Sequence, residues 1–518
     1  MLTSQEFIRL AKNFHRVPLW TVWKGLPDDP VLLCERLASK SPQGFLLDSG
    51  APSAQGRYIY FSAAPPSRTV ELNQDVVTWG PGRGDRKPLE GSPLDLLKPV
   101  LGESSPAPGG LPPFWGGAVG YLGYDLAPHF EPGLKGLAVR EDPLGLPHLA
   151  MGFYDEVIAL DLQEKKTILM VSLPGGRGLG AREGARLYEE TAGRLLKLEQ
   201  RVKLAGEGGP VPEARAKAPR SPKFKTTPDE RSFIRMVEQA KRAIERGDIY
   251  QANLSLRFSG SFASDPWSLH RRLRLVNPSP FAGFFWFPRF SMVSTSPELL
   301  LRVRGNRLET RPIAGTRPRG ASPLEDRKLE GALLLSPKER AEHIMLVDLE
   351  RNDLGRVCAT GSVRVSERMT IERYSHVMHI VSQVEGVLAP GRHPFEAVRA
   401  LFPGGTISGC PKIRAVQAIR ELEPLARGPF FGSAGWMGYS GDLDLNILIR
   451  TLVFKNGLAH LQAGAGIVAD SDPRQEYLES LQKARVILEA LQSGRPTSPS
   501  ASSRQALADL SHRSSEGA

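Results

Sequence analysis

A pair of glutamates, Glu339 and Glu342, lies near the start of a segment with a strong helix signal. Ser336 is a favourable N-cap, Pro337 suits the first helical position, and Glu339 completes a Ser-x-x-Glu capping box. Residues three apart share a helix face, and Glu342 lies in line with apolar residues that should face a core. A carboxylate in an apolar row is costly unless something pairs with it, and Mg²⁺ prefers carboxylate oxygen. The pattern is therefore compatible with a metal ligand pair.

A similar arrangement recurs near the end of the chain. Asp472 can cap a helix, Pro473 takes its first position, and Glu476 and Glu479 again lie three apart. Two helices that each bring two acids near their start could face one Mg²⁺ ion. The other explanation is a capping glutamate plus a surface glutamate paired with a neighbouring base, because structural ion pairs are common. The pattern alone leaves both open.

Two further residues could take part in proton transfer. Glu298 stands beside an apolar run, Thr-Ser-Pro-Glu-Leu-Leu-Leu, so its pKa should be raised and it could act as a general acid. A surface glutamate at a strand edge is the alternative. His379 lies in an apolar segment, where a histidine is more often a hydrogen-bonded core residue than a catalyst.

Two glycine-rich stretches are compatible with ligand binding. Residues 404–420 lead into a helix, and Thr406, Ser408 and Lys412 gather at its start, where free N–H groups and a lysine favour anions. The P-loop pattern is absent. Residues 462–470 are expected to form a second glycine turn that brings backbone N–H groups close to a ligand. A plain tight turn is the alternative for each.

The elements that must position these residues fall into four regions. Residues 1–203 are strand-rich and close with a helix, and residues 204–227 form a basic linker rich in Pro and Gly. Residues 228–492 mix strands with helices, and residues 493–518 are Ser-rich and aperiodic, which predicts disorder. Helices are expected at 228–246, 266–276, 336–356 and 471–487.

The charge of the chain raises the question of nucleic-acid binding. The 518 residues carry a net charge of +11, from 67 basic and 56 acidic residues. Much of the excess lies in residues 201–225, where Phe224 is the one interleaved aromatic residue. A solvated linker explains this segment better than a nucleic-acid site, so we expect no nucleic-acid partner. The positive balance could also attract an anionic small molecule.

The sequence favours a cytoplasmic protein. No apolar run reaches the roughly 18 residues needed to span a bilayer, and the N-terminus has no apolar signal core. Cys34, Cys358 and Cys410 are far apart and fit neither a disulfide framework nor a zinc site.

Many motifs occur in the order known from one family. They are DIYQANLS, TSPEL, RPIAGTRPRG, KERAEHIMLVDLERNDLGR, HVMHIVS, FPGGTISGCPKIRA, DLDLNILIRT and QAGAGIVADSDPRQEYLES. They cover about 235–490 densely, and LLDSG and GRYIYFSA extend a weaker match towards the N-terminus. The chain resembles the chorismate-utilising enzymes, which include the first components of anthranilate synthase and aminodeoxychorismate synthase. The resemblance implies an α+β fold of two large packed β-sheets, with helices outside and both halves contributing, so that 204–225 is an excursion rather than a domain boundary.

The resemblance also implies roles. Mg²⁺ would be held by Glu339, Glu342, Glu476 and Glu479, with Glu342 and Glu479 foremost, together with the ring carboxylate of chorismate. Glu298 matches the general acid that helps the C4 hydroxyl leave, and His379 matches an active-site histidine. The positions that match substrate contacts are Gly315, Thr316, Thr406, Arg450, Gly466 and Lys483. Relatives that add water carry a lysine at the position of Gln251, so this residue indicates ammonia as the nucleophile.

The ammonia must come from elsewhere. None of the three cysteines lies in the G-x-C-x-G context of a glutaminase nucleophile. The resemblance therefore implies a separate glutamine amidotransferase subunit. An inactive regulatory homologue is a further alternative, but the retained Glu298, Glu342 and Glu479 argue against it, since a drifting site should lose carboxylates that are costly to bury.

The motifs do not all indicate the same product. LLDSG, YQANL, FPGGTISGCPK, FGSAGW and DLDLNILIRTL are more similar to aminodeoxychorismate synthase, and RPIAGT and YSHVMHIVS to anthranilate synthase. Many aminodeoxychorismate synthases carry a lysine that attacks the ring where this chain has Ala314. We predict 4-amino-4-deoxychorismate as the product, with anthranilate plus pyruvate as the alternative.

Overall fold

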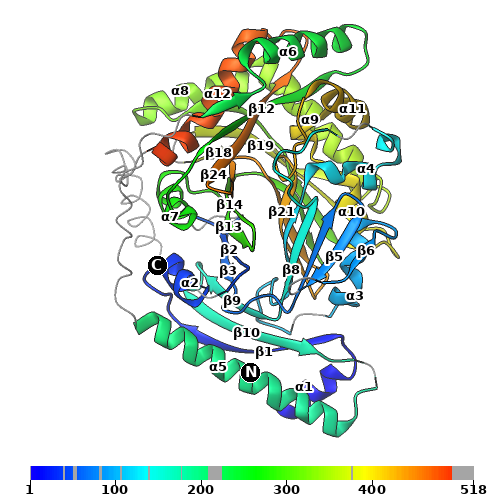
Figure 1. Cartoon of the computed structure of the whole chain (residues 1–518), viewed down its shortest axis with the longest axis vertical. Coiled ribbons are helices and arrows are strands. Elements are labelled where there is room, and N and C mark those ends of the chain that lie inside the picture. Colours follow the sequence, from blue (N-terminus) through cyan, green and yellow to red (C-terminus); the bar gives the residue numbers. More distant parts are fainter. Residues whose placement is uncertain are drawn as a thin grey trace.

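The computed structural model describes residues 2–38, 41–50, 55–80, 84–105, 108–137, 140–176, 178–207, 224–374 and 377–492 (Figure 1). The predicted disordered tail and residues 208–223 of the predicted linker lie outside this range. The predicted linker bounds are wrong at both described ends: helix α5 (Ala181–Glu207) extends four residues into the linker, and strand β11 (Lys225–Thr227) occupies its last three.

Two large antiparallel sheets form the molecule. Among the described residues, the first sheet has 12 strands, which follow one another across the sheet except that β20 pairs with β12. In spatial order they are β1 (Arg16–Lys24), β10 (Lys166–Pro174), β9 (Glu156–Asp161), β3 (Tyr58–Phe61), β2 (Gly44–Asp48), β13 (Phe281–Phe287), β14 (Phe290–Ser296), β23 (Thr451–Lys455), β24 (Leu458–Ile467), β12 (Gln251–Ser261) and β11, with β20 (Gly409–Cys410).

The second sheet also has 12 strands in the part of the chain that the structure describes, with β18 paired to β19 at one end. In spatial order they are β17 (Ile313–Pro318), β19 (Val377–Val387), β16 (Arg307–Arg311), β15 (Leu299–Arg304), β22 (Leu443–Ile447), β21 (Ser433–Gly438), β7 (Gly117–Leu122), β8 (Leu149–Tyr154), β4 (Arg68–Asn73), β5 (Val76–Gly80) and β6 (Arg86–Pro88), with β18 (Arg364–Arg373).

Helices lie on the outside of the two sheets (Figure 1). α1 and α5 pack beneath β1 and β10 at one end, whereas α6, α9, α11 and α12 gather at the other. The remaining helical bounds are α1 (Ser4–Ala11), α2 (Pro30–Ala38), α3 (Lys98–Leu101), α4 (Ala127–Phe130), α6 (Glu230–Glu245), α7 (Pro266–Val276), α8 (Pro323–Leu335), α9 (Pro337–Gly355), α10 (Pro394–Leu401), α11 (Lys412–Leu422) and α12 (Pro473–Gln492).

Both halves of the chain build both sheets. In the first sheet, β2 pairs with β13 and places Phe45 opposite Phe285. In the second, β7 pairs with β21 and places Gly120 opposite Gly435. The predicted α+β fold of two sheets shared by both halves is confirmed.

The main apolar core lies between the sheets. The rings of Phe114 and Trp436 lie 5.0 Å apart, and Phe45 and Tyr60 pack edge-on against Phe114. A second core fills the space between the first sheet and its helices, where buried Phe233 of α6 and Leu254 of β12 belong to one cluster. The strands of the first sheet are apolar on both faces because each face is covered.

The start of α9 follows its sequence signal only in part. The hydroxyl of Ser336 accepts a hydrogen bond from the backbone N–H of Glu339 at 3.3 Å, as the N-cap prediction requires. The reciprocal half of the predicted capping box is wrong, because the Glu339 carboxylate instead accepts from Nη1 of Arg317 at 3.1 Å. That carboxylate is thereby directed towards β17 rather than back to its own helix.

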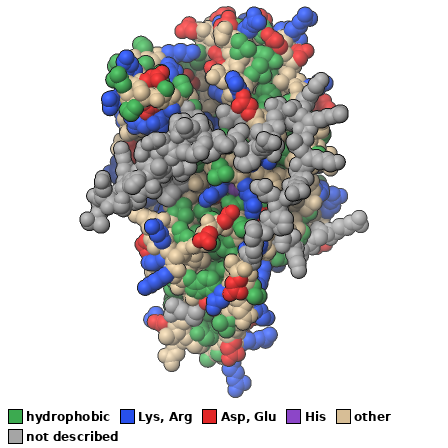
Figure 2. All heavy atoms as spheres, turned by 90° about the vertical axis from the view of Figure 1, so that its left-hand side faces the viewer, with side chains coloured by type: hydrophobic (Ala, Val, Ile, Leu, Met, Phe, Trp, Pro, Cys, Tyr) green, Lys and Arg blue, Asp and Glu red, His purple; other side chains and the backbone are tan. Residues whose placement is uncertain are grey.

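The surface of the molecule mixes both signs of charge. Figure 2 shows one face on which Lys and Arg side chains are interspersed with Asp and Glu. No helix that the structure describes combines the length and apolarity required to cross a membrane.

Candidate active site

Glu298 lies in the short connection between β14 and β15, which belong to different sheets. Its backbone is fixed by Ile447, whose N–H donates to the Glu298 carbonyl at 3.0 Å. Its carboxylate accepts from the N–H of Ile313, the first residue of β17, at 3.4 Å. The side chain is 4% exposed. The connection between the sheets thus holds one carboxyl group in the interior.

Burial raises the pKa of Glu298 to about 7. The Thr406 hydroxyl, the Ile313 N–H and the positive charge of Arg450 lower it, but they do not outweigh the loss of water. A carboxyl group with this pKa is partly protonated at neutral pH and can donate its proton to a leaving group. The predicted general acid therefore has the surroundings that the role needs.

His379 of β19 is neutral at physiological pH. Burial first, and then the charge of Arg450, lower its pKa to about 4. Its Nδ1 lies 3.1 Å from the carbonyl oxygen of Gly315 and 3.0 Å from the hydroxyl of Thr316. Since a carbonyl can only accept, Nδ1 carries the hydrogen and Nε2 carries the lone pair. That lone pair faces Nη2 of Arg450 at 3.5 Å.

Arg450 occupies an unusual backbone conformation. Its φ of +49° lies in the left-handed region that side chains other than glycine rarely adopt. Its carbonyl accepts from both the N–H and the hydroxyl of Thr295, each at 3.1 Å. These bonds hold a guanidinium beside Glu298 and His379, where its charge suits a carboxylate ligand.

Gly315 lies at an irregularity of β17 with φ +66°. A Cβ atom at this position would lie 2.8 Å from Oε2 of Glu339. Glycine is therefore required twice, by the backbone angle and by the close approach of Glu339. The contact brings the first predicted metal ligand of α9 against the same strand as Thr316.

Gln251 and Glu342 meet one helical turn further along α9. Nε2 of Gln251 donates to Oε1 of Glu342 at 3.3 Å. A Cβ atom on Gly466 of β24 would lie 2.3 Å from that Nε2 and 3.6 Å from Oε1 of Glu342, so the glycine makes room for both. Oε1 of Gln251 is buried and accepts no hydrogen bond within the described ranges. A small N–H donor would satisfy it.

The two acids of α12 have different surroundings. Glu476 is 8% exposed, and burial followed by the charge of Glu479 raises its pKa, against a bond from Ser471. The side chain of Glu479 is 52% exposed and lies 2.8 Å from Nζ of Lys483. Lys483 also donates to the carbonyl of Gly464 in β24, at 3.1 Å.

Two lysines link the acids of α9 with those of α12. Lys338 and Lys483 both lower the pKa of Glu342 and of Glu476. The pKa of Glu342 is raised by burial and by Glu339. The two helices therefore place their carboxylates in one neighbourhood, where burial and like charges disfavour the ionised forms of Glu342 and Glu476.

These residues fit a divalent cation as two pairs rather than as a closed cage. Within the described ranges no three Asp, Glu, His or Cys side chains come together in a group that could hold a metal ion. The raised pKa values of Glu342 and Glu476 show carboxylates that a cation would stabilise. A substrate carboxylate would have to complete the oxygen ligands.

Two readings of the glycine-rich stretches are wrong. Lys412 does not serve an anion site, because its Nζ is paired with Asp353 and donates to the carbonyl of Leu401 at 2.8 Å. Residues 462–467 are not a turn but the end of β24. Gly464 makes room for the backbone carbonyl of Leu254 and Gly466 for the side chain of Gln251, both in β12.

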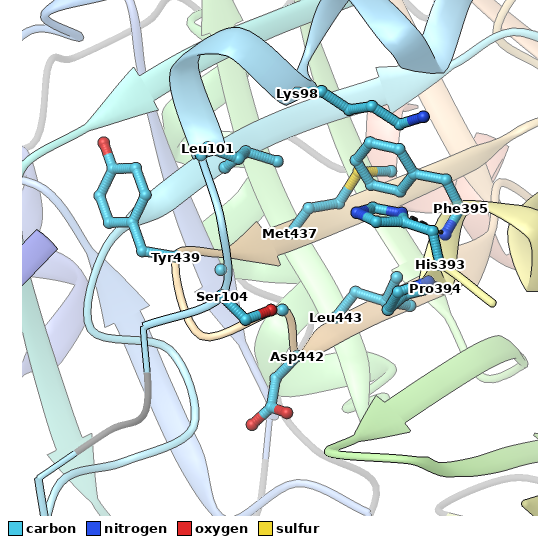
Figure 3. A pocket seen from close by; sticks show the side chains of 13 residues that line it. Lys98, Leu101, Ser104, His393, Pro394, Phe395, Met437, Tyr439, Asp442 and Leu443 are labelled. Atoms are coloured by element: carbon cyan, nitrogen blue, oxygen red, sulfur yellow. Dashed lines mark hydrogen bonds between the residues drawn. The ribbon is translucent and has the colours of Figure 1, made fainter. Parts of the chain in front are cut away.

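Two cavities among the described residues lie away from these side chains. One pocket lies between α3, the start of α10 and the turn after β21, where Phe395 N–H donates to His393 (Figure 3). A groove of about 840 Å³ is lined by residues that include Pro65, Arg86 and Arg289. Neither is lined by any of the predicted site residues. These instead follow a seam between α9, α12, β12, β17 and β19 that is buried at Gln251, Glu298 and His379 and open at Glu479.

Sequence reasoning missed two buried groups beside this seam. Glu350 of α9 is 2% exposed, and burial and Asp353 raise its pKa well above the usual range. Arg427 is buried with Glu423, four residues earlier. The Glu-x-x-x-Arg spacing was visible, but such pairs are ordinarily found on exposed helix faces, so the sequence held no signal of burial.

The comparisons with known proteins agree with this geometry. Residues 51–489 match the family of chorismate binding enzymes. Anthranilate synthase component 1 of Thermus thermophilus is 42% identical over 468 residues, which cover 90% of this chain and 96% of that protein. Aminodeoxychorismate synthase component 1 of Bacillus subtilis is 41% identical over 464 residues, covering 88% and 93%. The crystal structure of anthranilate synthase component I from Streptococcus pneumoniae is 34% identical with a TM-score of 0.72, covering 85% and 93%.

Proposed function

The chain belongs to the chorismate binding enzyme family, and from that premise we propose that it aminates chorismate to 4-amino-4-deoxychorismate, as part of 4-aminobenzoate and folate synthesis. Its relatives make it a chorismate-utilising enzyme of the anthranilate synthase and aminodeoxychorismate synthase type. The position of Glu298 carries the proposal, because a buried carboxyl with a pKa of about 7 can protonate the departing C4 hydroxyl.

The opposite side of the seam supports ammonia as the nucleophile. Gln251 is 3% exposed and offers a buried oxygen with no donor among the described residues. This oxygen can accept an N–H of ammonia, whereas an amide cannot serve as the base that would activate water. His379 presents the lone pair of Nε2, and Arg450 and Lys483 supply positive charge for the substrate carboxylates.

Glu342 and Glu479 would hold Mg²⁺, with Glu339 and Glu476 beside them. When bound, Mg²⁺ supplies positive charge to the ring carboxylate of the substrate. Glu479 would hold the cation from its place beside Lys483. Lys483, which donates to the Gly464 carbonyl, would supply positive charge to the substrate carboxylates.

A separate glutamine amidotransferase would deliver the ammonia. Both curated relatives described above are named as a component 1, which implies a second component. Cys358 and Cys410 are partly buried, and burial raises the pKa of each thiol above its ordinary value, opposite to what a nucleophilic cysteine needs.

Anthranilate synthase is the second candidate, and Ala314 is the observation that favours it. This residue is 7% exposed on β17 between Ile313 and Gly315, and its methyl group cannot attack the ring. The more similar relatives also include several anthranilate synthases. The motif variants YQANL, FPGGTISGCPK and FGSAGW favour aminodeoxychorismate, so we retain that product.

The test is an assay with chorismate, Mg²⁺ and ammonium, with products separated by chromatography in the presence and absence of aminodeoxychorismate lyase. We expect 4-aminobenzoate only when the lyase is added. Fluorescent anthranilate and pyruvate without the lyase would contradict the proposed product. With glutamine in place of ammonium, the chain alone should be inactive until a glutaminase subunit is supplied.

A further inference from the structure

We propose that Arg427 is a positioning residue of the candidate active site, which locks the segment carrying Thr406 to the strand carrying Gln251. The proposal rests on the proposed function for its kinetic consequences only. Arg427 touches none of the predicted catalytic side chains directly. It acts through the backbone on which two of them stand.

The guanidinium joins two pieces of backbone. Nη1 of Arg427 donates to the carbonyl of Ile407 at 3.0 Å, and Nη2 donates to the carbonyl of Asn253 at 2.5 Å. Ile407 ends the short 3₁₀ helix η4 (Gly405–Ile407), which contains Thr406. Asn253 lies two residues after Gln251 on β12. One side chain thus fixes the distance between the two elements.

Asn253 adds direct bonds between the same elements. Its backbone N–H donates to the carbonyl of Ser408 at 2.9 Å, and its side-chain Nδ2 donates to the carbonyl of Thr406 at 3.2 Å. Arg427 and Asn253 together therefore tie three successive carbonyls, those of residues 406, 407 and 408, to β12. Thr406, placed in this way, carries a buried hydroxyl that has no hydrogen-bond partner among the described residues and lies close enough to Glu298 to lower its pKa.

Glu423 fixes the guanidinium in turn. Nε and Nη2 of Arg427 donate to its two carboxylate oxygens at 2.9 and 2.8 Å. Glu423 also accepts from the N–H and hydroxyl of Ser255, again on β12, at 2.9 and 2.7 Å. Burial by itself lowers the pKa of Arg427, but Glu423 outweighs it and leaves the pKa above the usual range. The arginine remains a cation with its orientation determined.

Aromatic rings stack against the guanidinium, one of them from the N-terminal half of the chain. Its centre lies 4.4 Å from the ring of Tyr124 and 4.6 Å from the ring of Phe431. The next residue, Asp125, accepts from the N–H of Gly428 at 2.7 Å. The N-terminal half therefore supports the seam at the point where Arg427 acts.

An arginine is needed for this arrangement, and stability is a poor explanation for it. Replacing a buried ion pair by apolar groups is often neutral for stability. A planar fork of N–H donors can reach a carboxylate and two carbonyls at once, which a lysine cannot do. We therefore assign Arg427 the role of holding η4 against β12 rather than that of stabilising the fold.

The test compares Arg427→Lys with a matched control, Arg16→Lys. Arg16 is also buried, donates to Asp155 at 2.7 Å and lies 4.4 Å from the ring of Tyr439, but it contacts neither β12 nor η4. We expect Arg427→Lys to lower kcat about 10²-fold, the scale of a misplacement of about 1 Å, with KM for chorismate within about threefold of the wild type. Arg16→Lys should keep kcat.

The pH profile separates position from stability. The Thr406 hydroxyl lowers the pKa of Glu298, so its displacement should move the alkaline limb of activity to higher pH in Arg427→Lys and leave it unchanged in Arg16→Lys. If Arg427→Lys fails to fold, Asn253→Ala removes the bond to Thr406 without leaving a buried charge, and should lower kcat about fivefold, the scale of one hydrogen bond. The proposal would be overturned if folded Arg427→Lys, or Asn253→Ala, kept both the wild-type kcat and the wild-type alkaline limb of the pH–activity profile.

Hydrogen–deuterium exchange makes the test independent of the proposed function. Faster exchange across residues 404–410 in Arg427→Lys than in Arg16→Lys supports the positioning role even if the wild type consumes no chorismate. That absence of turnover would refute the proposed function alone. Equal exchange in the two variants would refute the positioning role, whatever the reaction.

Discussion

Glu298 and Glu479 carry the same side chain in opposite surroundings. Glu298 is 4% exposed, and its carboxylate accepts from one backbone N–H, that of Ile313. The side chain of Glu479 is 52% exposed and paired with Lys483. Burial raises the pKa of Glu298 to about 7, so the first environment favours the protonated form. The comparison sets the proposed proton donor, which is buried, against a proposed metal ligand, which is half exposed and paired with a lysine.

The largest expected effect concerns the proposed metal ligands. Excess chelator should abolish turnover, and Glu342→Gln or Glu479→Gln should reduce it by about 10³-fold or more, on the scale of a lost electrostatic contact in the transition state. Glu489→Gln is the matched control, because Glu489 lies on α12 in a similar exposed pair with Arg485. Full activity in excess chelator would contradict the proposed requirement for Mg²⁺.

The buried acid comes next. Glu298→Gln should keep chorismate binding, measured by calorimetry, and lose about 10²–10⁴ in kcat, the range for a positioned proton donor. The amide has nearly the shape of the carboxyl, so the fold should survive. Unchanged kcat would transfer the acid role to another group, and Glu350 would be the first to examine.

The smallest expected effect is on pH dependence. Turnover should fall about tenfold per pH unit above a pKa of about 7, because Glu298 must be protonated. Its folded pKa is raised from 4.5, so its stabilising contribution is full below about pH 4.5 and is lost as pH rises through about 7. At pH 8 the free energy of unfolding of Glu298→Gln should therefore exceed that of the wild type by on the order of 3 kcal/mol. Denaturant melts at pH 5 and pH 8 check this, and a gain at pH 5 equal to that at pH 8 would contradict the assigned pKa.

Local signals in the sequence predicted the elements that carry the site. The prolines and caps at Pro266 and Ser336 placed α7 and α9 to within about a residue, because such ends are decided by neighbours in the chain. The predicted end of the last helix, Ile487, was five residues short of Gln492, since that helix has no strong stop signal. The family motifs supplied the site residues, several of which the structure places in one seam.

Contacts between residues far apart in the chain could not be predicted from the sequence. Residues 462–470 were predicted to form a glycine turn, but 462–467 belong to β24, whose glycines make room for the backbone and side chains of β12 about 200 residues earlier. The role of Arg427 likewise depends on contacts with Asn253 and Tyr124, which lie far away in the chain. Such contacts depend on sheet order, which periodicity does not report.

The sharing of both sheets between the two halves has a consequence for how this chain can change. A foreign N-terminal half would have to reproduce two registers at once, β2 against β13 and β7 against β21. It would also have to bring a tyrosine against the guanidinium of Arg427. A chimera joined near the middle of the chain from two relatives should therefore disturb both sheets and the surroundings of Arg427 at once.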